Sequence, residues 1–457
     1  LRWRDAPHSS APAILCGVWG RWGGDPAQRR IRAAYERGVT VDLGGVPHPA
    51  RAQVRAEVLA DLLTRPGTPP RAALRLRSAR IVGRLDLRDI EVAVPVSFHE
   101  CVFTDVPELA GARVVDLAFV DCTLPGLSAR LIEVRKDVTL TDCTVTGPVD
   151  LRDARVGGSV HLDGTRMRCP GRVVFGADRL TVGGDLTARH GFAADGELRL
   201  IHCQVGSQLN LMGASLHNPG GFALNLGGAR VASLWLTFAT RPTGRVRLAG
   251  VQAETIFDNP ETWAAELDLV GCTYRLLVAR APTGPGIPSP LVPVTVRQRL
   301  DWLRRSPEGY APQPYEQLAE AYRRGGQEAE ARRVLLERQR RRRATLRLPG
   351  RLFGYLVDGL IGYGYRTWQA GIWLLGFWAL GTVCFALDPP EPRNAEEAPT
   401  PNAALQALDA LLPIVNLGHD NAWNPSGATE YVSALLVLAG WVLTTAVVAG
   451  LTRTLNP

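Results

Sequence analysis

The most regular feature of this 457-residue chain is a short alternation of apolar and polar positions that recurs from residue 73 to residue 280. A typical copy is Val149-Asp150-Leu151, and most copies are followed by a turn rich in Gly or Asp. Cys101, Cys122 and Cys143 recur every 21 residues, and Leu-containing copies recur about every 11. A strand this short cannot bury an apolar face alone, whereas stacked coils share one continuous core. We therefore predict a β-solenoid (β-helix) over residues 73–280.

Two of the repeated segments, Ile81-Val82-Gly83-Arg84-Leu85 and Val182-Gly183-Gly184-Asp185-Leu186, resemble those of bactofilin-like and pentapeptide-repeat-like β-helices. The resemblance implies a stack of coils and no particular activity. In such a stack we expect the recurring Cys to point inward as small apolar side chains. The recurring His and Asp are expected at the surface, with no metal, cofactor or catalytic role; they are His99, His161, His202, Asp86, Asp150 and Asp163.

The segments that flank the repeats are expected to be helical or extended connections. Residues 1–72 are predicted to form a helical cap on the first coil, because an uncapped solenoid exposes apolar edges. A Pro- and Gly-rich linker follows at 281–295. Residues 296–350 are expected to form a helical adaptor whose tetratricopeptide-like hairpin turns at Gly325-Gly326. Residues 351–367, rich in Tyr, are expected to lie at a membrane interface.

A different pattern begins at residue 368, where apolar residues continue without charge. The segments 368–387 and 431–453 each provide the roughly 20 residues that a helix needs to cross a bilayer, so we predict two transmembrane helices. The loop 388–430 between them starts with acidic residues and then contains a short apolar stretch, 402–413, that ends at a Pro. This stretch is too short to span. We expect it to enter the bilayer and turn back, which is tolerated only where protein or water surrounds the irregular backbone.

The order helix, short re-entrant helix, polar loop, helix resembles the pore module of two-transmembrane, potassium-channel-like ion channels. The resemblance covers roughly the last ninety residues. It implies that 402–413 is the pore helix and that four copies surround a path for monovalent cations. The segment in place of the family's Val-Gly-Tyr-Gly-Asp filter is Val415, Asn416, Leu417, Gly418 and His419, with Asp420 next. Residues expected to line the path from the second helix are Gly440, Thr444, Thr445 and Ala449.

The filter-like segment departs from the family at two positions. Asn416 occupies the position of the family's first Gly, and Leu417 occupies the position of its Tyr. The second Gly of the family is present as Gly418. Stacked backbone carbonyls replace the hydration shell of potassium, and they depend on the dihedral freedom of Gly. Two alternatives follow. The path is a wider, non-selective cation pore, or the module is a plain two-helix anchor whose loop only dips into the interface.

The distribution of charged residues predicts how the chain is oriented across the membrane. The formal net charge is +8, but the basic residues gather before the first apolar segment, whereas the loop between the two segments is mainly acidic. Five arginines are expected to attract lipid headgroups and to set the orientation in the membrane: Arg340, Arg341, Arg342, Arg343 and Arg351. Positive flanks stay in the cytoplasm. Both termini and the solenoid are therefore expected in the cytoplasm, at a bacterial inner membrane, and no nucleic-acid binding is expected. The absence of an apolar segment at the front agrees with this expectation.

The sequence as a whole predicts a multidomain protein: a cytoplasmic β-solenoid, a small α-helical adaptor and an α-helical transmembrane pore module. Its predicted function is a cation channel that the solenoid gates or scaffolds, and no enzyme activity is expected, because no dinucleotide, haem or C-x-x-C motif is present. The alternative is a non-conducting, membrane-anchored scaffold that polymerises through the ends of the solenoid. Helical caps on both ends would oppose that alternative.

Overall fold

The structure is a computed structural model. It describes residues 26–44, 53–64, 72–284, 287–346, 348, 367–389, 391–392, 402–412, 423–424 and 427–455. The chain divides into two compact units, Leu1–Gly309 and Tyr310–Pro457.

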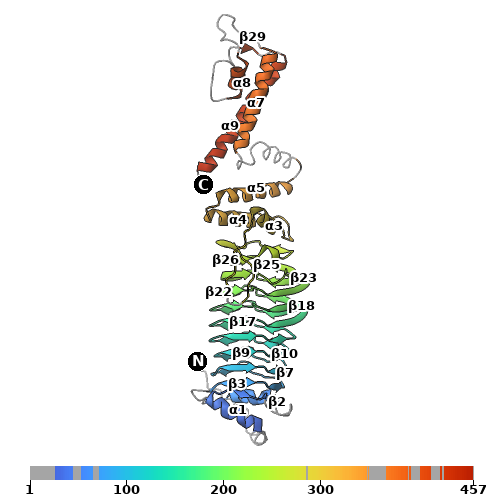
Figure 1. Ribbon diagram of the computed structural model, residues 1–457, viewed down its shortest axis with the longest axis vertical. Helices are drawn as coiled ribbons and strands as arrows, with labels where there is room; N and C mark the ends of the chain where they lie inside the picture. The colour runs from blue at the N-terminus through green and yellow to red at the C-terminus, as the bar shows by residue number, and fades with distance from the viewer. Residues whose placement is uncertain are drawn as a thin grey trace, which may run out of the picture. The chain divides into compact units, whose positions relative to one another are not determined.

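The predicted β-solenoid is confirmed: short parallel strands stack into about nine turns (Figure 1). They form one sheet of 16 strands and one of 12. Along each sheet a strand pairs with the strands one turn earlier and one turn later; β6 (Val96–His99), for example, lies in register between β3 (Leu74–Arg77) and β9 (Leu117–Val120). Like positions of successive coils therefore lie on top of one another.

The remaining strands have the following bounds. In the larger sheet they are β1 (Val41–Asp42), β5 (Glu91–Val92), β8 (Arg113–Val114), β12 (Glu133–Val134), β13 (Val138–Thr141), β16 (Arg155–Val156), β17 (Val160–His161), β19 (Thr181–Val182), β20 (Leu186–Thr187), β22 (Gln204–Asn210), β24 (Arg230–Leu236), β26 (Gln252–Asp258) and β28 (Leu276–Ala279). In the smaller sheet they are β2 (Gln53–Arg55), β4 (Arg80–Val82), β7 (Val102–Phe103), β10 (Thr123–Leu124), β11 (Leu127–Ser128), β14 (Thr144–Val145), β15 (Val149–Asp150), β18 (Arg166–Gly176), β21 (Ala193–Arg199), β23 (Ser215–Asn225), β25 (Thr243–Arg247) and β27 (Leu267–Asp268).

Positive φ angles turn the chain at the corners between these strands. Glu100, Asp121 and Asp142 occupy one corner in three successive coils, with φ of 51°, 53° and 53°. Gly164, with φ of 72°, takes that place in the next coil. Gly and Asp adopt this left-handed conformation more readily than most residues, which explains why the repeats carry Gly or Asp between apolar positions.

The three Cys that follow these corners point inward, as predicted. Cys101, Cys122 and Cys143 are 0%, 1% and 1% exposed. The Cys122 thiol donates to the Phe98 carbonyl at 3.4 Å, and Phe98 stacks on Phe119 with ring centroids 5.4 Å apart. The Cys column is therefore part of the apolar core.

The recurring Asp lie on the outside but are paired with arginine rather than merely hydrated. Each is half-buried beside a guanidinium, and the pairs are Asp86–Arg88, Asp150–Arg152 and Asp163–Arg189. His99 and His161 are also half-buried, and His202 is exposed. Among the described residues, no group of three or more His, Cys, Asp or Glu is placed to hold a metal ion.

The coils are not uniform in length. β18 and β23 are each 11 residues long, and their pairing contains register shifts around Pro170-Gly171 and Pro219-Gly220. The extra residues bulge at one corner without breaking the stack. The 21-residue spacing of the Cys therefore holds only for the earlier coils.

The first coil is covered by α1 (Pro26–Arg37) and α2 (Ala56–Leu63). Their inward residues include Ile31 and Leu59, which are 1% and 0% exposed. The Tyr35 carbonyl of α1 accepts a hydrogen bond from the backbone of Ala73, just before β3, at 3.2 Å. These helices lie within residues 1–72, the part expected to cap the solenoid.

The last coils are closed by α3 (Val296–Leu303), which begins with a capping box between Thr295 and Gln298. Arg299 of α3 forms a buried bidentate ion pair with Asp258 of β26, and the two side chains are 5% and 2% exposed. The Trp263 indole also donates to Asp258, at 2.9 Å. The sequence assigned 296–350 to one adaptor, but α3 packs on the solenoid because this ion pair holds it there.

In the second unit, α4 (Gln313–Arg324) and α5 (Glu328–Ala344) form a helical hairpin. Gly326 makes the turn with φ of 72°. Leu318 and Ala319 of α4 and Val334 of α5 are buried. The β-solenoid is thus followed by a helical C-terminal region, as the sequence predicted.

Candidate membrane-spanning and pore region

The helix α7 (Thr367–Leu387) is the most apolar helix of the second unit. Among the described residues, Gln369–Leu387 is the one helical segment long and apolar enough to cross a membrane. Only 17% of its most apolar stretch of 18 residues is buried. Leu375, Leu380 and Val383 are 64%, 49% and 55% exposed. A core helix of a soluble domain usually buries such side chains, so α7 is a candidate membrane span by its length, composition and exposure.

The second predicted span corresponds to α9 (Ala428–Leu455), a helix of 28 residues. Its apolar described part, Thr429–Thr445, is shorter than a membrane-spanning segment, and the side chains that follow Thr445 lie outside the described residues. The two-span pore module predicted from the sequence is therefore not confirmed.

Between these helices lies α8 (Ala403–Leu411), a helix of nine residues within the stretch expected to be the pore helix. Asn402 caps its N-terminus, because the Asn402 side chain accepts from the backbone of Ala404 and Leu405 at 3.1 and 3.2 Å. The Trp378 indole of α7 donates to the Ala404 carbonyl at 3.0 Å. A cap at one end and a tryptophan beside it fix where this short helix starts.

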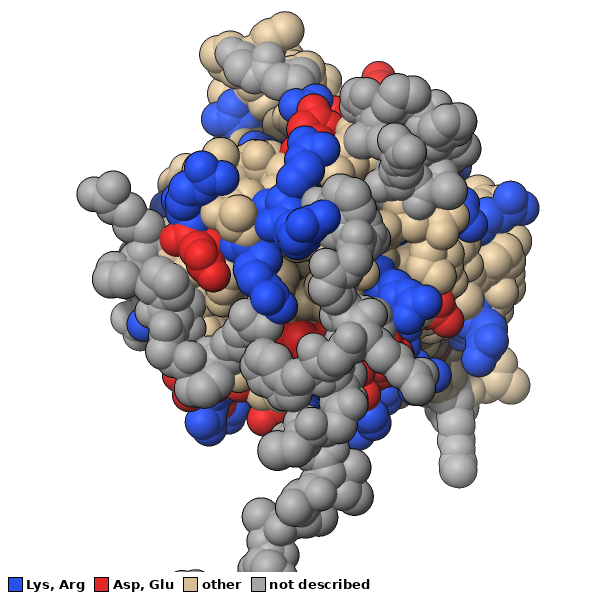
Figure 2. All heavy atoms as spheres, turned by 90° about the horizontal axis from the view of Figure 1, so that it is seen from below, with Lys and Arg blue, Asp and Glu red and all other residues tan. Residues whose placement is uncertain are grey.

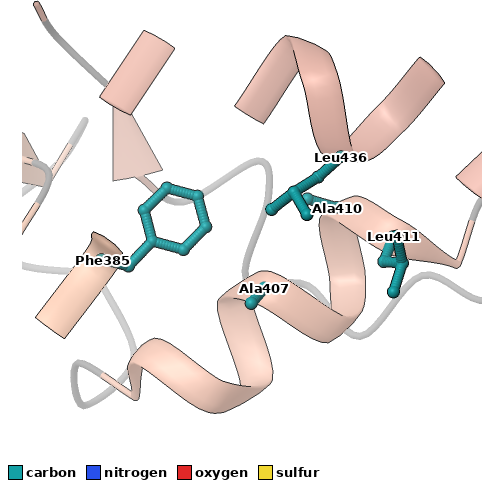
Figure 3. Packing of buried hydrophobic residues seen from close by; sticks show 5 residues of the cluster. All are labelled: Phe385, Ala407, Ala410, Leu411 and Leu436. Carbon is teal, nitrogen blue, oxygen red and sulfur yellow. The ribbon is translucent and has the colours of Figure 1, made fainter. Parts of the chain in front are cut away.

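The short helix packs against both of its longer neighbours. Phe385 of α7, Ala407, Ala410 and Leu411 of α8, and Leu436 of α9 form one buried cluster, none more than 3% exposed (Figure 3). This cluster joins the three helices, so α8 is not a loose connection between α7 and α9.

Two glycines allow this close packing. A Cβ at Gly440 of α9 would overlap the carbonyl oxygen of Leu411, at the end of α8. A Cβ at Gly381 of α7 would lie 2.7 Å from Leu436 and 3.0 Å from Ala407. Gly440 is thus placed where α9 meets the end of α8, and its assignment to the lining of a path stays a prediction.

Two polar side chains of α8 are buried. Gln406 and Asp409 are each 7% exposed, although the helix around them is apolar. They stand three residues apart, so they share one face of α8. A carboxylate buried among apolar side chains is costly unless it is paired or hydrogen-bonded, and Asp409 does interact with another group.

The loop that contains α8 is closed at its base. β29 (Glu391–Pro392), just after α7, pairs antiparallel with β30 (Trp423–Asn424), just before α9. The segment between the two strands therefore leaves and returns at one place.

The predicted site residues are only partly described. Val415, Asn416, Leu417, Gly418, His419 and Asp420 lie outside the described residues, as do Arg351 and the side chain of Ala449. Thr444 is half-buried, and the exposed Thr445 hydroxyl donates to the Trp441 carbonyl at 2.7 Å.

The arginines assigned to lipid headgroups end α5. Arg341, Arg342 and Arg343 occupy its last turn, where cations also favour the negative end of the helix dipole. Arg341 pairs with Glu337 at 3.3 Å, and Arg342 is exposed. These arginines can therefore stabilise the end of α5, and their assignment to lipid headgroups stays a prediction.

Sequence reasoning missed two parts of this arrangement. Asn402 carries a recognisable signal, an Asn directly before an apolar helical stretch. Gly381 carries none, because its need for a missing Cβ depends on Leu436 and Ala407, which are remote in sequence.

Comparisons of the chain with protein-family models, with curated proteins and with solved structures found no match. The function is therefore argued from the geometry above.

Proposed function

We propose that this chain is a membrane channel for monovalent cations, whose C-terminal helices conduct and whose cytoplasmic solenoid scaffolds or gates them. The observation that carries the proposal is the packing of α8, a helix of nine residues buried between two longer apolar helices. A simple anchor needs no third, half-length helix packed against both of the others. Short re-entrant helices occur where the following backbone lines a cavity.

One chain supplies too few helices to surround a path, so the proposal requires several copies, four by the resemblance. Side chains on α7 and α9 offer apolar surface to lipid and to neighbouring copies. The exposed ones include Ile372, Leu375, Leu380, Leu435, Leu438 and Val442.

In this proposal the constriction is the segment 415–420, which follows α8. Asn416 in place of a Gly favours a path that discriminates weakly between potassium and sodium. The arginines at the end of α5 favour the cytoplasmic side for the solenoid.

The test is the current through purified protein in a planar bilayer, with potassium on one side and sodium on the other. We compare wild type with Gly418→Trp and with the control Gly371→Trp. A Cβ at Gly371 of α7 meets no atom within 4 Å, so the control adds the same bulk at an open position. We expect the Gly418 variant alone to lose the current, and a reversal potential near zero.

The alternative is a non-conducting, membrane-anchored scaffold. It is favoured by there being one candidate span among the described residues. It is opposed by the helices at both ends of the solenoid, which occupy the surfaces that end-to-end polymers would use. Absence of current from wild-type protein that is folded and oligomeric would favour the scaffold.

A further inference from the structure

The N-terminal cap carries four exposed arginines on one helix, Arg29, Arg30, Arg32 and Arg37 of α1. Figure 2 looks at the end of the solenoid where α1 lies, and basic side chains gather there. Within the described part of the chain, none of the four forms an ion pair.

Many arginines on the coils behave differently, because a carboxylate lies beside them. Examples are Arg77 with Glu100, Arg179 with Asp153 and Arg189 with Asp163. Guanidinium groups left without a carboxylate, side by side on a helix, repel one another in the absence of an anion. This surface is therefore suited to an anionic ligand.

A pocket of about 750 Å³ lies between α1 and β1, and three of the four arginines line it. Arg29 and Arg37 stand one turn to either side of Ala33 on the same stripe of the helix, and Arg30 is adjacent. Ala33, Ala34 and Val41 supply small apolar side chains to the lining. A pocket of this size falls in the range of small-molecule sites, about 300–1,000 Å³.

We propose that this pocket binds a small phosphate-bearing anion with two or more phosphate groups. The planar guanidinium fork matches phosphate oxygens in a bidentate manner, and three arginines call for more than one negative charge. The one acidic residue in the lining, Asp42, accepts a hydrogen bond from the backbone of Gly44 at 2.8 Å, within its own turn. Val39, 52% exposed at the rim, offers an apolar contact to the rest of an organic phosphate.

The test is calorimetric titration of the full-length protein in detergent with adenosine triphosphate, inorganic pyrophosphate and adenosine. Adenosine triphosphate and pyrophosphate are expected to bind saturably, whereas adenosine is expected not to bind. The ratio of the affinities for adenosine triphosphate and pyrophosphate distinguishes an organic from an inorganic ligand. The double variant Arg29→Gln/Arg37→Gln is expected to weaken binding by about tenfold or more.

Two further variants separate a pocket from general charge attraction. Ala33→Leu fills the space between Arg29 and Arg37 without changing any charge, and it is expected to weaken binding as well. Arg32→Gln removes an exposed arginine of the same helix that does not line the pocket, so its affinity should stay within about twofold of wild type.

The proposal is overturned if folded wild-type protein binds neither phosphate compound, if Arg32→Gln weakens binding as much as the double variant, or if Ala33→Leu leaves the affinity unchanged. Binding is measured without any current. The result is therefore independent of whether the C-terminal helices conduct.

Discussion

Single residues decide how closely the C-terminal helices approach. Gly440 lies against the Leu411 carbonyl, so a side chain there would push α8 away from α9. Gly381 lies against the side chains of Leu436 and Ala407, which would have to move to admit a Cβ. Other glycines of α7, such as Gly371 and Gly376, meet no atom within 4 Å. Identical residues in one region therefore have unequal importance, which depends on contacts that the sequence does not reveal.

Replacing Gly440 with Ala is expected to destabilise the helical region by about 1–3 kcal/mol, the usual cost of forcing extra volume into a packed site. The matched control is Gly371→Ala, for which we expect no loss. Thermal unfolding in detergent, followed by circular dichroism, measures both. Equal melting temperatures for the two variants would contradict the packing of α8 against α9.

The inward direction of Cys101, Cys122 and Cys143 could be predicted, because a small apolar residue at a fixed repeat position must share the environment of its equivalents. Burial also raises the pKa of Cys203 and Cys272, each to about 12. Alkylation of the native protein at pH 8 is therefore expected to leave these thiols unmodified and to proceed after denaturation. Rapid labelling in the native state, measured by mass spectrometry, would contradict their place in the core.

At the scale of elements, α3 is held to the solenoid by a buried charge pair. Two tryptophans lie beside this pair, with the Arg299 guanidinium 5.3 Å from the Trp263 ring and 5.6 Å from the Trp302 ring. The sequence predicted a helix here but not its partner, because Arg299 lies in a helix beyond the repeats, whereas Asp258 lies in a strand 41 residues earlier. Charge pairing across elements has no local signal.

Arg299→Ala is expected to lower the free energy of unfolding by about 3–5 kcal/mol, because it leaves the Asp258 carboxylate buried without its partner. The control Arg304→Ala removes an arginine whose pair with Asp301 is exposed, and it should cost about 0–1 kcal/mol. Urea unfolding followed by tryptophan fluorescence reports both. A control as destabilising as Arg299→Ala would refute the special role of the buried pair.

Exposed ion pairs between and within coils make the solenoid sensitive to acid. The hydrogen bond from Arg77 lowers the pKa of Glu100, and that from Arg179 lowers the pKa of Asp153. A carboxyl with a lowered folded pKa stabilises the fold above its unfolded value and loses that contribution as the pH falls through the folded value. The ordinary values are 4.5 for Glu and 3.8 for Asp.

Stability is therefore expected to stay level from pH 7 to about pH 5 and to decline below pH 4.5. Urea titrations at successive pH values measure it, and Glu100→Gln should reduce the decline. A decrease in the free energy of unfolding on raising the pH from 5 to 7 would contradict a stabilising contribution from these ion pairs.

At the scale of the whole molecule, the solenoid could be predicted because the same alternation of apolar and polar residues recurs in many copies. An irregular copy therefore does not hide the pattern. The sequence did not predict the longer coils of β18 and β23, where exposed Pro-Gly pairs interrupt the alternation of buried and exposed residues while the strands stay paired. The C-terminal region occurs once in the chain, and its helices could be recognised only by length and apolarity. Its filter-like segment stays a prediction.

The helices at both ends of the solenoid predict discrete particles. Light scattering of the protein in detergent should give one mass across a tenfold range of concentration, and negative-stain images should show no filaments. Filaments that grow with concentration would favour the scaffold over the channel.

The register of the coils has a consequence for how such a chain changes length. Val96, Leu117 and Val138 occupy one position in three successive turns. Removing residues 117–137 would place Val138 beside Val96, in the position that Leu117 has now, while Val138 would keep its pairing with Val160. A solenoid of this kind can thus gain or lose whole turns during evolution, which alters the distance between its two ends while each end keeps its own chemistry.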